Sequence, residues 1–211
     1  MIADAVHVAI FARAPRAGQA KTRLIPALGA QGAARLQRWL TNRAVGTALR
    51  SDVGGVTLWC APDARHPFFR AMHERLHVEC RDQSGADLGE RMRRAFEAHC
   101  PQGPLLLIGT DCPALEPSDL RDAGRALREG QDAVVLPAED GGYVLIGLRE
   151  PRASLFEGIA WGTDAVMPTT RERLRALAVR WCEPRTLWDV DRPEDLARVR
   201  ALCPDAPAAP R

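Results

Sequence analysis

Four consecutive apolar residues followed closely by an acid constrain the fold of this chain most. Residues 105–108 are Leu-Leu-Leu-Ile, preceded by Gly103 and Pro104 and followed by Gly109. This run predicts a strand buried on both faces, as in the middle of a parallel sheet. Asp111 then lies beyond the carboxyl end of a central strand, where open α/β sheets bind ligands. The sequence therefore predicts an α/β fold with Asp111 in its functional site.

Length and composition place few limits on function. The chain has 211 residues, for which one domain over residues 1–203 is expected, with a disordered Ala- and Pro-rich tail at 204–211. Lys and Arg number 29 and Asp and Glu 27, so the net charge of +2 predicts no nucleic-acid partner. No apolar run reaches the roughly 20 residues of a membrane span, and no signal segment is evident. We therefore expect a cytoplasmic location and no membrane partner; the sequence specifies no oligomeric state.

The cysteines do not form a recognisable metal or disulfide pattern. There are six, none in a CxxC pair, which favours free thiols in a reducing compartment. Cys112 stands out because it follows Asp111.

Hydrophobic periodicity predicts alternating strands and helices along the chain. The expected strands are residues 6–12, 53–61, 77–80, 105–108, 132–137, 143–148 and 179–182, and the expected helices are 31–49, 63–76, 87–99, 117–129, 164–177 and one ending at Leu202. We expect Asp63 to cap the second helix, and Asp191 or Arg192 to cap the last, with Pro193 at its first position. Residues 138–143 predict a tight turn, and hence a hairpin or a chain reversal over the site.

A basic loop follows the first predicted strand. Residues 13–24 contain Pro15 and Gly18 together with the cations Arg13, Arg16, Lys21 and Arg23. Backbone N–H groups near a glycine and side-chain cations are a common way to hold phosphates. The segment matches neither GxxxxGK[ST] nor GxGxxG. A phosphate loop is the favoured interpretation, and a solvated basic loop is the alternative.

Two acids from distant positions complete the predicted site. Asp111 and Asp191 are the candidate ligands of Mg²⁺ or Mn²⁺, because such ions take oxygen ligands and bridge to phosphate oxygens. The metal would neutralise a diphosphate, and Lys21 and Arg23 would share that work. A turn or helix cap is the alternative role of each acid.

Six segments, in order along nearly the whole chain, resemble one known family. They are FARAPRAGQAKTRL, QSGADLGERM, LIGTDCPAL, AEDGGYVLIGL, FEGIAWGT and DVDRPEDL. Together they are similar to the DUF2064 group of glycosyltransferase-like proteins, relatives of the nucleotide-diphospho-sugar transferases with a GT-A fold. The resemblance implies a three-layer α/β/α sandwich, Rossmann-like, with a mostly parallel central sheet. It also implies a nucleotide site over the N-terminal half and an acceptor site over the C-terminal half.

The resemblance extends to single residues. The positions it implies for nucleotide binding are Ala12, Gly18, Lys21, Arg23, Gln83, Gly85, Asp87 and Asp111, and Asp191 matches a later acid that supplies a second metal ligand in similar nucleotidyltransferases. GT-A glycosyltransferases more usually carry Asp-x-Asp where this chain has Asp-Cys-Pro. In that respect the chain is closer to the molybdenum-cofactor and phospholactate nucleotidyltransferases.

Three functions remain open from the sequence. The first is transfer of a sugar from a nucleoside diphosphate sugar to a small acceptor. Asp140 is then the candidate base and Lys21 a second catalytic residue, while Gly141, Gly142, Tyr143 and Trp161 are candidate acceptor-binding residues. The second is nucleotidyl transfer from a nucleoside triphosphate with release of pyrophosphate. The third is a nucleotide-binding module without turnover. Asp140 as a turn former and Trp161 as a core residue are the structural alternatives.

Overall fold

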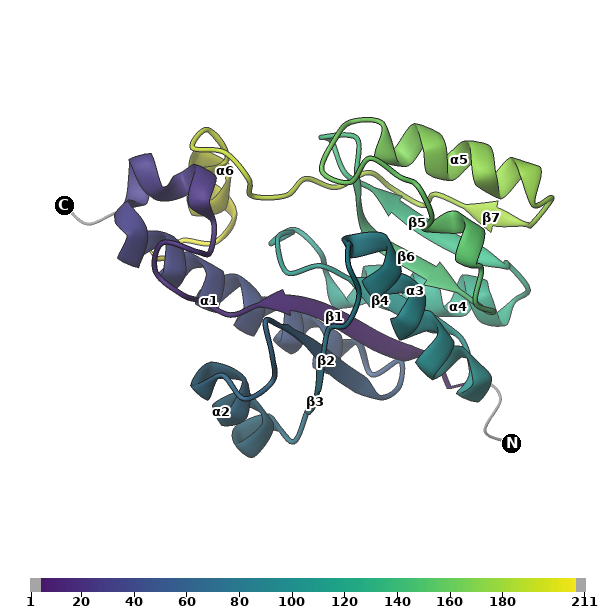
Figure 1. The fold of residues 1–211 in the computed structure, drawn as a ribbon, viewed down its shortest axis with the longest axis horizontal. Helices are drawn as coiled ribbons and strands as arrows, with labels where there is room; N and C mark the ends of the chain where they lie inside the picture. The colour runs from purple at the N-terminus through teal and green to yellow at the C-terminus, as the bar shows by residue number, and fades with distance from the viewer. Residues whose placement is uncertain (1–4, 208–211) are drawn as a thin grey trace.

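A seven-stranded sheet lies between helices on both of its faces (Figure 1) in the computed structural model, which describes residues 5–207. Its strands are β1 (His7–Arg13), β2 (Val56–Ala61), β3 (Glu79–Asp82), β4 (Leu105–Ile108), β5 (Ala133–Pro137), β6 (Tyr143–Leu148) and β7 (Trp181–Cys182). Their order is β3-β2-β1-β4-β6-β5-β7. Only β6 pairs antiparallel with both of its neighbours, β4 and β5. The mostly parallel sheet expected from the sequence is confirmed.

The helices form two layers. They are α1 (Ile25–Ser51), α2 (Pro67–Leu76), α3 (Leu88–His99), α4 (Pro117–Arg128), α5 (Val166–Ala176) and α6 (Asp195–Leu202). One core cluster joins α1, α2 and α4 to one face of the sheet, and a second joins α3 and α5 to the other. A third, smaller cluster joins α6 to the N-terminal half of α1, apart from the sheet (Figure 1). The fold is therefore an α/β/α sandwich with an added helical corner.

Strand β1 shows why the sheet is covered on both sides. Val8 and Ile10 belong to the cluster under α1, whereas Ala9 and Phe11 pack in the cluster under α3. Successive side chains of a strand point to opposite faces, so an apolar run with no polar alternation requires cover on both faces. Strand β4 follows the same rule, because all four of its residues are buried.

Four predicted helix starts differ from the structure by two residues or more. α1 begins at Ile25 and not at residue 31, and α5 begins at Val166 and not at residue 164. The other two are α2 and α6, where side chains form turns ahead of the helices. α2 begins at Pro67, and His66 caps it by accepting the N–H of Phe68. The expected cap Asp63 instead accepts the N–H of Arg65 in a turn of its own. α6 begins at Asp195 and not at Pro193. These short polar side chains bond to backbone groups outside a helix as readily as at its cap.

The last helix begins late for a related reason. The Asp195 carboxylate accepts the N–H groups of Asp191 and Arg192 at 2.9 and 2.7 Å. This turn holds residues 191–194 outside the helix. Asp191 therefore does not cap α6 and its carboxylate is available for another partner.

All six cysteines are free thiols, as the sequence predicts. The thiol of Cys80 on β3 donates to the carbonyl of Phe69 in α2, at 3.6 Å. Burial raises the pKa of the Cys112 thiol to about 12. Burial therefore disfavours the thiolate form of Cys112 at neutral pH.

The ends of the chain add two observations. Within the described residues, the Trp39 indole donates to Asp205 at 3.4 Å and Ala206 packs against the helical corner. The rest of the expected tail, residues 208–211, lies outside the described residues. In the part of the chain from 5 to 207, no helix combines the length and the apolarity that crossing a membrane requires.

The strand order positions the functional site. The chain runs from β1 outward to β2 and β3, and then crosses to β4 on the other side of β1. The loops after β1 and β4 consequently diverge at one edge of the sheet, which is where open α/β sheets bind ligands. The basic loop and Asp111 follow these two strands. The two segments are therefore expected to meet at this edge.

Candidate nucleotide and acceptor site

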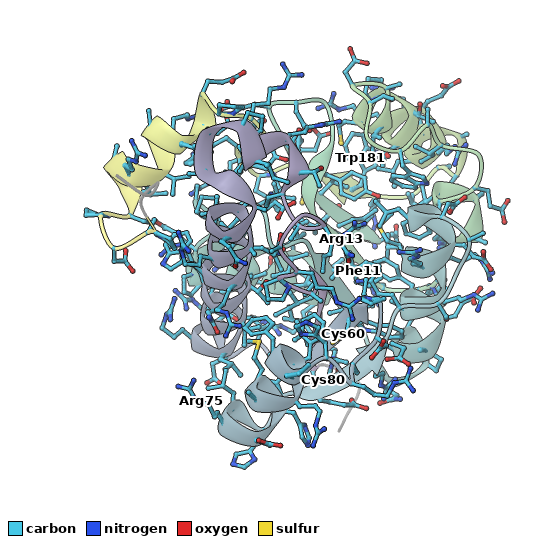
Figure 2. The ribbon with its side chains drawn as sticks, turned by 60° about the vertical axis from the view of Figure 1, so that its left-hand side comes forward. Phe11, Arg13, Cys60, Arg75, Cys80 and Trp181 are labelled. Carbon is cyan, nitrogen blue, oxygen red and sulfur yellow. The ribbon has the colours of Figure 1, made fainter. Side chains whose placement is uncertain are left out.

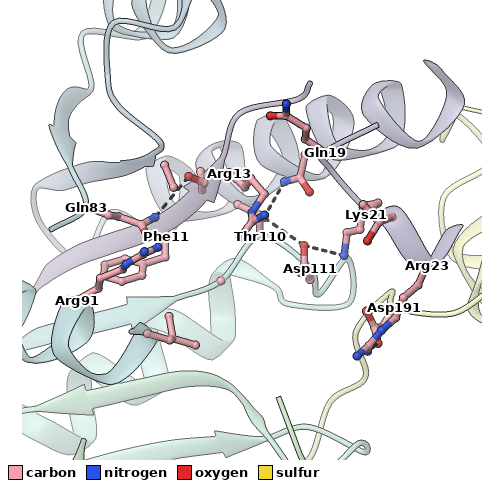
Figure 3. Close-up of a pocket in the computed structure, with 16 residues that line it drawn as sticks. Phe11, Arg13, Gln19, Lys21, Arg23, Gln83, Arg91, Thr110, Asp111 and Asp191 are labelled. Atoms are coloured by element: carbon pink, nitrogen blue, oxygen red, sulfur yellow. Dashed lines mark hydrogen bonds and ion pairs between the residues drawn. The ribbon is translucent and has the colours of Figure 1, made fainter. Parts of the chain in front are cut away.

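Lys21 and Asp111 meet at the carboxyl edge of the sheet. The Lys21 ammonium lies 2.8 Å from Oδ1 of Asp111, and its side chain is only 6% exposed. It also donates to the carbonyl of Val190. Lys21 has a left-handed backbone, with φ of 49°, at the start of the short turn Thr22–Leu24. The loop thus places one buried cation on the acid that follows β4 (Figure 3).

Asp111 is held from behind by a polar chain. Its Oδ1 accepts the Thr110 hydroxyl at 3.2 Å, and that hydroxyl accepts the side-chain amide of Gln37 at 3.1 Å. Gln37 is 3% exposed on α1. The Asp111 side chain itself is about half exposed, at 49%. A supported carboxylate that faces solvent is suited to binding a ligand.

The two acids of the C-terminal motif have different surroundings. The Asp191 carboxylate forms an ion pair with Arg23 of the basic loop. Asp189, two residues earlier, is half-buried and faces the site. The backbone between them is fixed, because Val190 donates its N–H to the Asp111 carbonyl at 2.8 Å. Asp189 is close enough to Asp111 for the Asp111 carboxylate to influence its pKa, and Asp191 lines the same cavity as Asp111.

The charge environment of Asp189 supports this placement. Burial, and next the nearby Asp140 and Asp111 carboxylates, raise the pKa of Asp189 to about 6, against a smaller opposite effect of Lys21. Asp191 is the second metal ligand expected from the sequence, which gave no role to Asp189.

A cavity of about 550 Å³ opens beside Lys21 and Asp111. Residues of the basic loop and the residues that follow β4 both line it, and the lining is rich in cations (Figure 3). The charged residues of the lining are Arg13, Lys21, Arg23, Arg91, Asp111 and Asp191. We call this space the nucleotide cavity. Its volume falls in the range of small-molecule and cofactor sites.

The predicted nucleotide-binding residues divide into two groups. Ala12 and Gln83 line the nucleotide cavity, and the Gln83 amide donates to the Ala12 and Trp59 carbonyls at 3.4 and 2.9 Å. Gly18, Gly85 and Asp87 do not line it. Asp87 caps α3 by accepting the Glu90 N–H at 2.8 Å. Gly85 accepts the Arg91 guanidinium, which does line the cavity.

The predicted acceptor residues lie around a second, apolar recess of about 170 Å³. Gly142, Tyr143 and Trp161 line it together with Asp140. The Tyr143 and Trp161 rings meet edge to face, with centroids 6.4 Å apart. The recess shares Phe11, Leu88 and Gly109 with the nucleotide cavity, so the two adjoin each other.

Gly141 stands behind this recess. Its φ is +91°, and a Cβ at this position would meet the Asp164 Cα at 2.5 Å. The glycine lets residues 139–142 approach residues 162–164 closely. Gly141 therefore shapes the loop contact, while Gly142 faces the recess.

The acids at this edge fit a divalent cation. Within residues 5–207, no three His, Cys, Asp or Glu side chains converge as a preformed metal site. Mg²⁺ does not require one, because it is commonly held by one or two carboxylates with waters and substrate phosphates. Burial, and next the nearby Asp140 and Asp111 carboxylates, disfavour the charged form of Asp189, and a bound cation would favour it. Asp111 and Asp189 are the residues that would hold it.

The fold of this chain is that of nucleotidyltransferases and nucleotide-diphospho-sugar transferases. Solved structures of such proteins match over nearly the whole chain. More specifically, the chain belongs to the DUF2064 family, described as "uncharacterized protein conserved in bacteria", whose model matches residues 44–163.

Three similar proteins were compared with this chain. A phosphoenolpyruvate guanylyltransferase of Rubrobacter xylanophilus is 38% identical over 120 residues, which are 55% of this chain and 56% of the relative. The chain thus matches only about half the length of that curated relative. A protein of Desulfovibrio desulfuricans G20, assigned as a nucleotide-diphospho-sugar transferase, has a TM-score of 0.83 and 28% identity, covering 93% of this chain and 88% of its own.

The third similar protein is a solved structure that contains a metal. It is a manganese complex of Rv0371c from Mycobacterium tuberculosis H37Rv, with a TM-score of 0.52 and 14% identity, and it covers 92% of this chain and 97% of its own. At this identity the likeness concerns the fold alone.

Proposed function

We propose that this chain is a metal-dependent nucleotidyltransferase, which joins a nucleoside monophosphate to a small acceptor and releases pyrophosphate. The charge of the nucleotide cavity carries the proposal, because its four cations outnumber its two carboxylates. A nucleoside triphosphate keeps a net negative charge after it binds one divalent ion. A nucleoside diphosphate sugar with the same ion is close to neutral. The cationic cavity therefore complements the triphosphate better.

The residues have distinct roles in this proposal. Lys21 and Arg23 neutralise the phosphates, and the basic loop holds the phosphates in place for an in-line attack. Asp111 and Asp189 hold Mg²⁺ or Mn²⁺, which would stabilise the charge on the leaving pyrophosphate. Asp140, at the junction with the apolar recess, accepts the proton of the acceptor hydroxyl.

Two further observations support nucleotidyl transfer. The relative of 38% identity is named as a guanylyltransferase. In addition, a single Asp-Cys-Pro follows β4, without the second acid of an Asp-x-Asp motif. The second metal ligand then has to come from elsewhere, and Asp189 lies beside Asp111 to supply it.

Sugar transfer from a nucleoside diphosphate sugar is the second candidate. It is favoured by the 28% identity over 93% of the chain to a protein assigned as a nucleotide-diphospho-sugar transferase. The same cavity would hold the donor nucleotide, and Asp140 would again serve as base. The two functions differ in the bond that breaks, and hence in the product released.

Ligand binding followed by product analysis separates the two functions. Thermal shifts with each nucleoside triphosphate and each nucleoside diphosphate sugar, with Mg²⁺ or Mn²⁺, identify the donor, because a ligand of the folded state raises the melting temperature. We expect a triphosphate to give the larger shift. Turnover with pooled small acceptors should then release pyrophosphate. Release of a nucleoside diphosphate from a nucleotide sugar would instead support the second candidate.

A variant of Lys21 tests the site itself. Lys21→Met should weaken triphosphate binding by about 10- to 100-fold, the effect of losing one charge-assisted hydrogen bond. Arg75→Met is the matched control, because Arg75 is an exposed cation on α2, far from the site (Figure 2). Equal binding by both variants would exclude this cavity as the nucleotide site. Metal-dependent binding without turnover of any donor would support a nucleotide-binding module.

A further inference from the structure

A third cavity, of about 560 Å³, adjoins the nucleotide cavity at Arg23 and Asp191. It also shares Asp140, Gly162 and Thr163 with the apolar recess. Its charged lining consists of Glu139, Asp140, Asp164, Asp189, Asp191 and Asp195 against Arg23, Arg192 and Arg198. We call it the acidic cavity. An acceptor that reaches the nucleotide from the C-terminal half of the sheet passes through it or through the recess.

Most of the cations of the acidic cavity are already neutralised. Arg198 donates to both oxygens of Glu139, at 2.7 and 3.0 Å, and its guanidinium lies over the Trp188 ring at 4.4 Å. Arg23 is paired with Asp191. This leaves Arg192 as the one lining guanidinium that forms no ion pair within the described residues. The acidic cavity therefore offers few unpaired cations to a bound anion.

Two of its acids, in contrast, are uncompensated. Across residues 5–207, Asp140 and Asp164 have no ion-pair partner within 4.0 Å, and both are exposed to the cavity. Asp189 has no ion-pair partner among these residues either, but the divalent cation of the proposed function would neutralise it. The electrostatic potential in the acidic cavity is consequently negative, whereas the potential in the nucleotide cavity is positive.

The adjoining recess adds a second, independent constraint. Its walls are Phe11, Met92, Tyr143, Trp161 and other apolar side chains. The only hydrogen bond of the Tyr143 hydroxyl among the described residues is a weak one to the Met92 sulfur, at 3.7 Å. A dry apolar cavity of about 150 Å³ is large enough to bind benzene, and the recess measures about 170 Å³. It is therefore suited to one flat apolar group.

We propose that the acceptor is an uncharged or cationic hydroxyl compound that carries a flat apolar group, and that acids are excluded. This rests on the nucleotidyl transfer proposed above and specifies its acceptor. The acceptor oxygen forms a bond to the α-phosphorus while the bond from that phosphorus to the bridging oxygen breaks. Pyrophosphate leaves with the electron pair, and the hydroxyl proton passes to the Asp140 carboxylate. An acceptor phosphate or carboxylate would need no such base and would be repelled by the acids around it.

This acceptor differs from the compound after which the Rubrobacter relative is named. Phosphoenolpyruvate carries a phosphate and a carboxylate, and both would face the unpaired acids of the acidic cavity. The likeness to that relative, which spans about half of each chain, therefore extends in our proposal to the nucleotide and not to the acceptor.

Three phenols of nearly equal size test the proposal, because they differ mainly in charge. Tyramine is cationic, tyrosol is neutral and 4-hydroxyphenylacetate is anionic. Dissociation constants are measured by ligand-observed NMR on the full chain, with and without Mg²⁺ and the triphosphate that gives the largest thermal shift. We expect tyramine and tyrosol to bind at least about fivefold more tightly than the anion, the effect of one like charge in a solvated site. Phosphoenolpyruvate should not compete with either.

Charge-neutralising variants link the preference to the acidic cavity. Asp164→Asn should bring the dissociation constants of tyramine and 4-hydroxyphenylacetate closer together, since Asp164 lines the cavity. Glu74→Gln, which removes an exposed acid on α2, should leave the ratio of the two constants unchanged. Asp164 packs against Gly141 through its backbone, so the side-chain amide preserves the loop contact.

Each outcome decides a separate question. Equal or tighter binding of 4-hydroxyphenylacetate or phosphoenolpyruvate overturns the charge preference, and failure of all three phenols to bind at millimolar concentration overturns the role of the recess. If the phenols show the expected order but no triphosphate binds, the proposed function fails while the character of the acceptor side stands.

Discussion

At the residue scale, the C-terminal motif shows how two similar acids acquire different roles. Asp191 is paired with Arg23, whereas Asp189 is half-buried beside Asp140 and Asp111. An acid held among other acids gains most from a bound cation. An acid already bound by a guanidinium gains less. We therefore expect the loss of the Asp189 carboxylate to weaken metal binding more than the loss of the Asp191 carboxylate.

Substitution of each acid by its amide tests this difference. Asp111→Asn and Asp189→Asn should each weaken Mn²⁺ binding in the presence of a triphosphate by at least about tenfold, because each removes an anionic oxygen ligand. Asp191→Asn should weaken it by less, since that change acts through Arg23. Isothermal titration of Mn²⁺ into the protein with saturating nucleotide measures the three values. A larger loss for Asp191→Asn than for Asp189→Asn would restore the assignment made from the sequence.

A pair of stacked histidines lies at the opposite edge of the sheet. The His7 and His99 rings are 4.3 Å apart at an angle of 17°, and the His7 Nε2 lies 2.8 Å from the Thr57 hydroxyl. Burial, followed by the nearby His99, lowers the pKa of His7 to about 4. Burial also lowers the pKa of His99. Both rings are consequently neutral in the folded protein at pH values where the unfolded chain already binds protons.

This pair should make the protein lose stability on mild acidification. Between about pH 6.5 and pH 4 the unfolded chain binds more protons at these rings than the folded one, so the free energy of unfolding falls as pH falls. We expect His7 alone to contribute about 2 kcal/mol of this loss. Urea unfolding at several pH values should show a smaller loss for His7→Gln than for the parent. Identical pH profiles for the two proteins would mean that His7 is charged in the fold.

At the element scale, the close approach of β6 to β4 depends on a glycine. A Cβ at Gly147 would lie 2.6 Å from the Leu106 Cδ2 and 3.2 Å from the Leu127 Cδ1. Leu106 and Leu127 are both fully buried, so neither side chain has room to move. Overpacking of this kind costs about 1–3 kcal/mol.

A matched pair of glycine substitutions isolates that contact. Gly147→Ala should lower the free energy of unfolding by about 1–3 kcal/mol. Gly124→Ala in α4 should raise it by about 0.5–1 kcal/mol, because its Cβ would make ordinary contacts at 3.6 and 3.7 Å and alanine favours a helix. Chemical denaturation measures both. The same sign for the two variants would show that the core around Leu106 is looser than described.

The elements also show what the sequence could predict. β1, β4 and β6 were predicted within one residue, because their apolar runs are bounded by glycine, proline or charge. Helix starts were less accurate, since Asp63 and Asp195 bond to turns that precede their helices. Local periodicity reports which face of an element is buried, and it does not report which of several polar residues caps it.

At the scale of the whole molecule, the site is built by a contact between the two ends of the chain. The helical corner contains Leu24, from the basic loop region, and Val190, from the C-terminal motif, and both are fully buried. The sequence predicted that the basic loop and Asp111 share one edge, because both follow strands of a parallel sheet. It could not predict that the C-terminal motif would meet the basic loop, since this depends on a contact between Lys21 and Val190, more than 160 positions apart.

Because the corner supports the basic loop, its packing should affect nucleotide binding as well as stability. Leu24→Ala and Leu174→Ala each remove a leucine side chain with 0% exposure, the first in the corner and the second in the core under α5. Each should lower the free energy of unfolding by about 2–5 kcal/mol. Only Leu24→Ala should also weaken triphosphate binding, because the cavity it leaves lies next to Arg23 and the turn that follows Lys21. Dissociation constants measured at a temperature where both variants are fully folded separate the two effects, and equal losses of affinity would show that the corner is not the support of the loop.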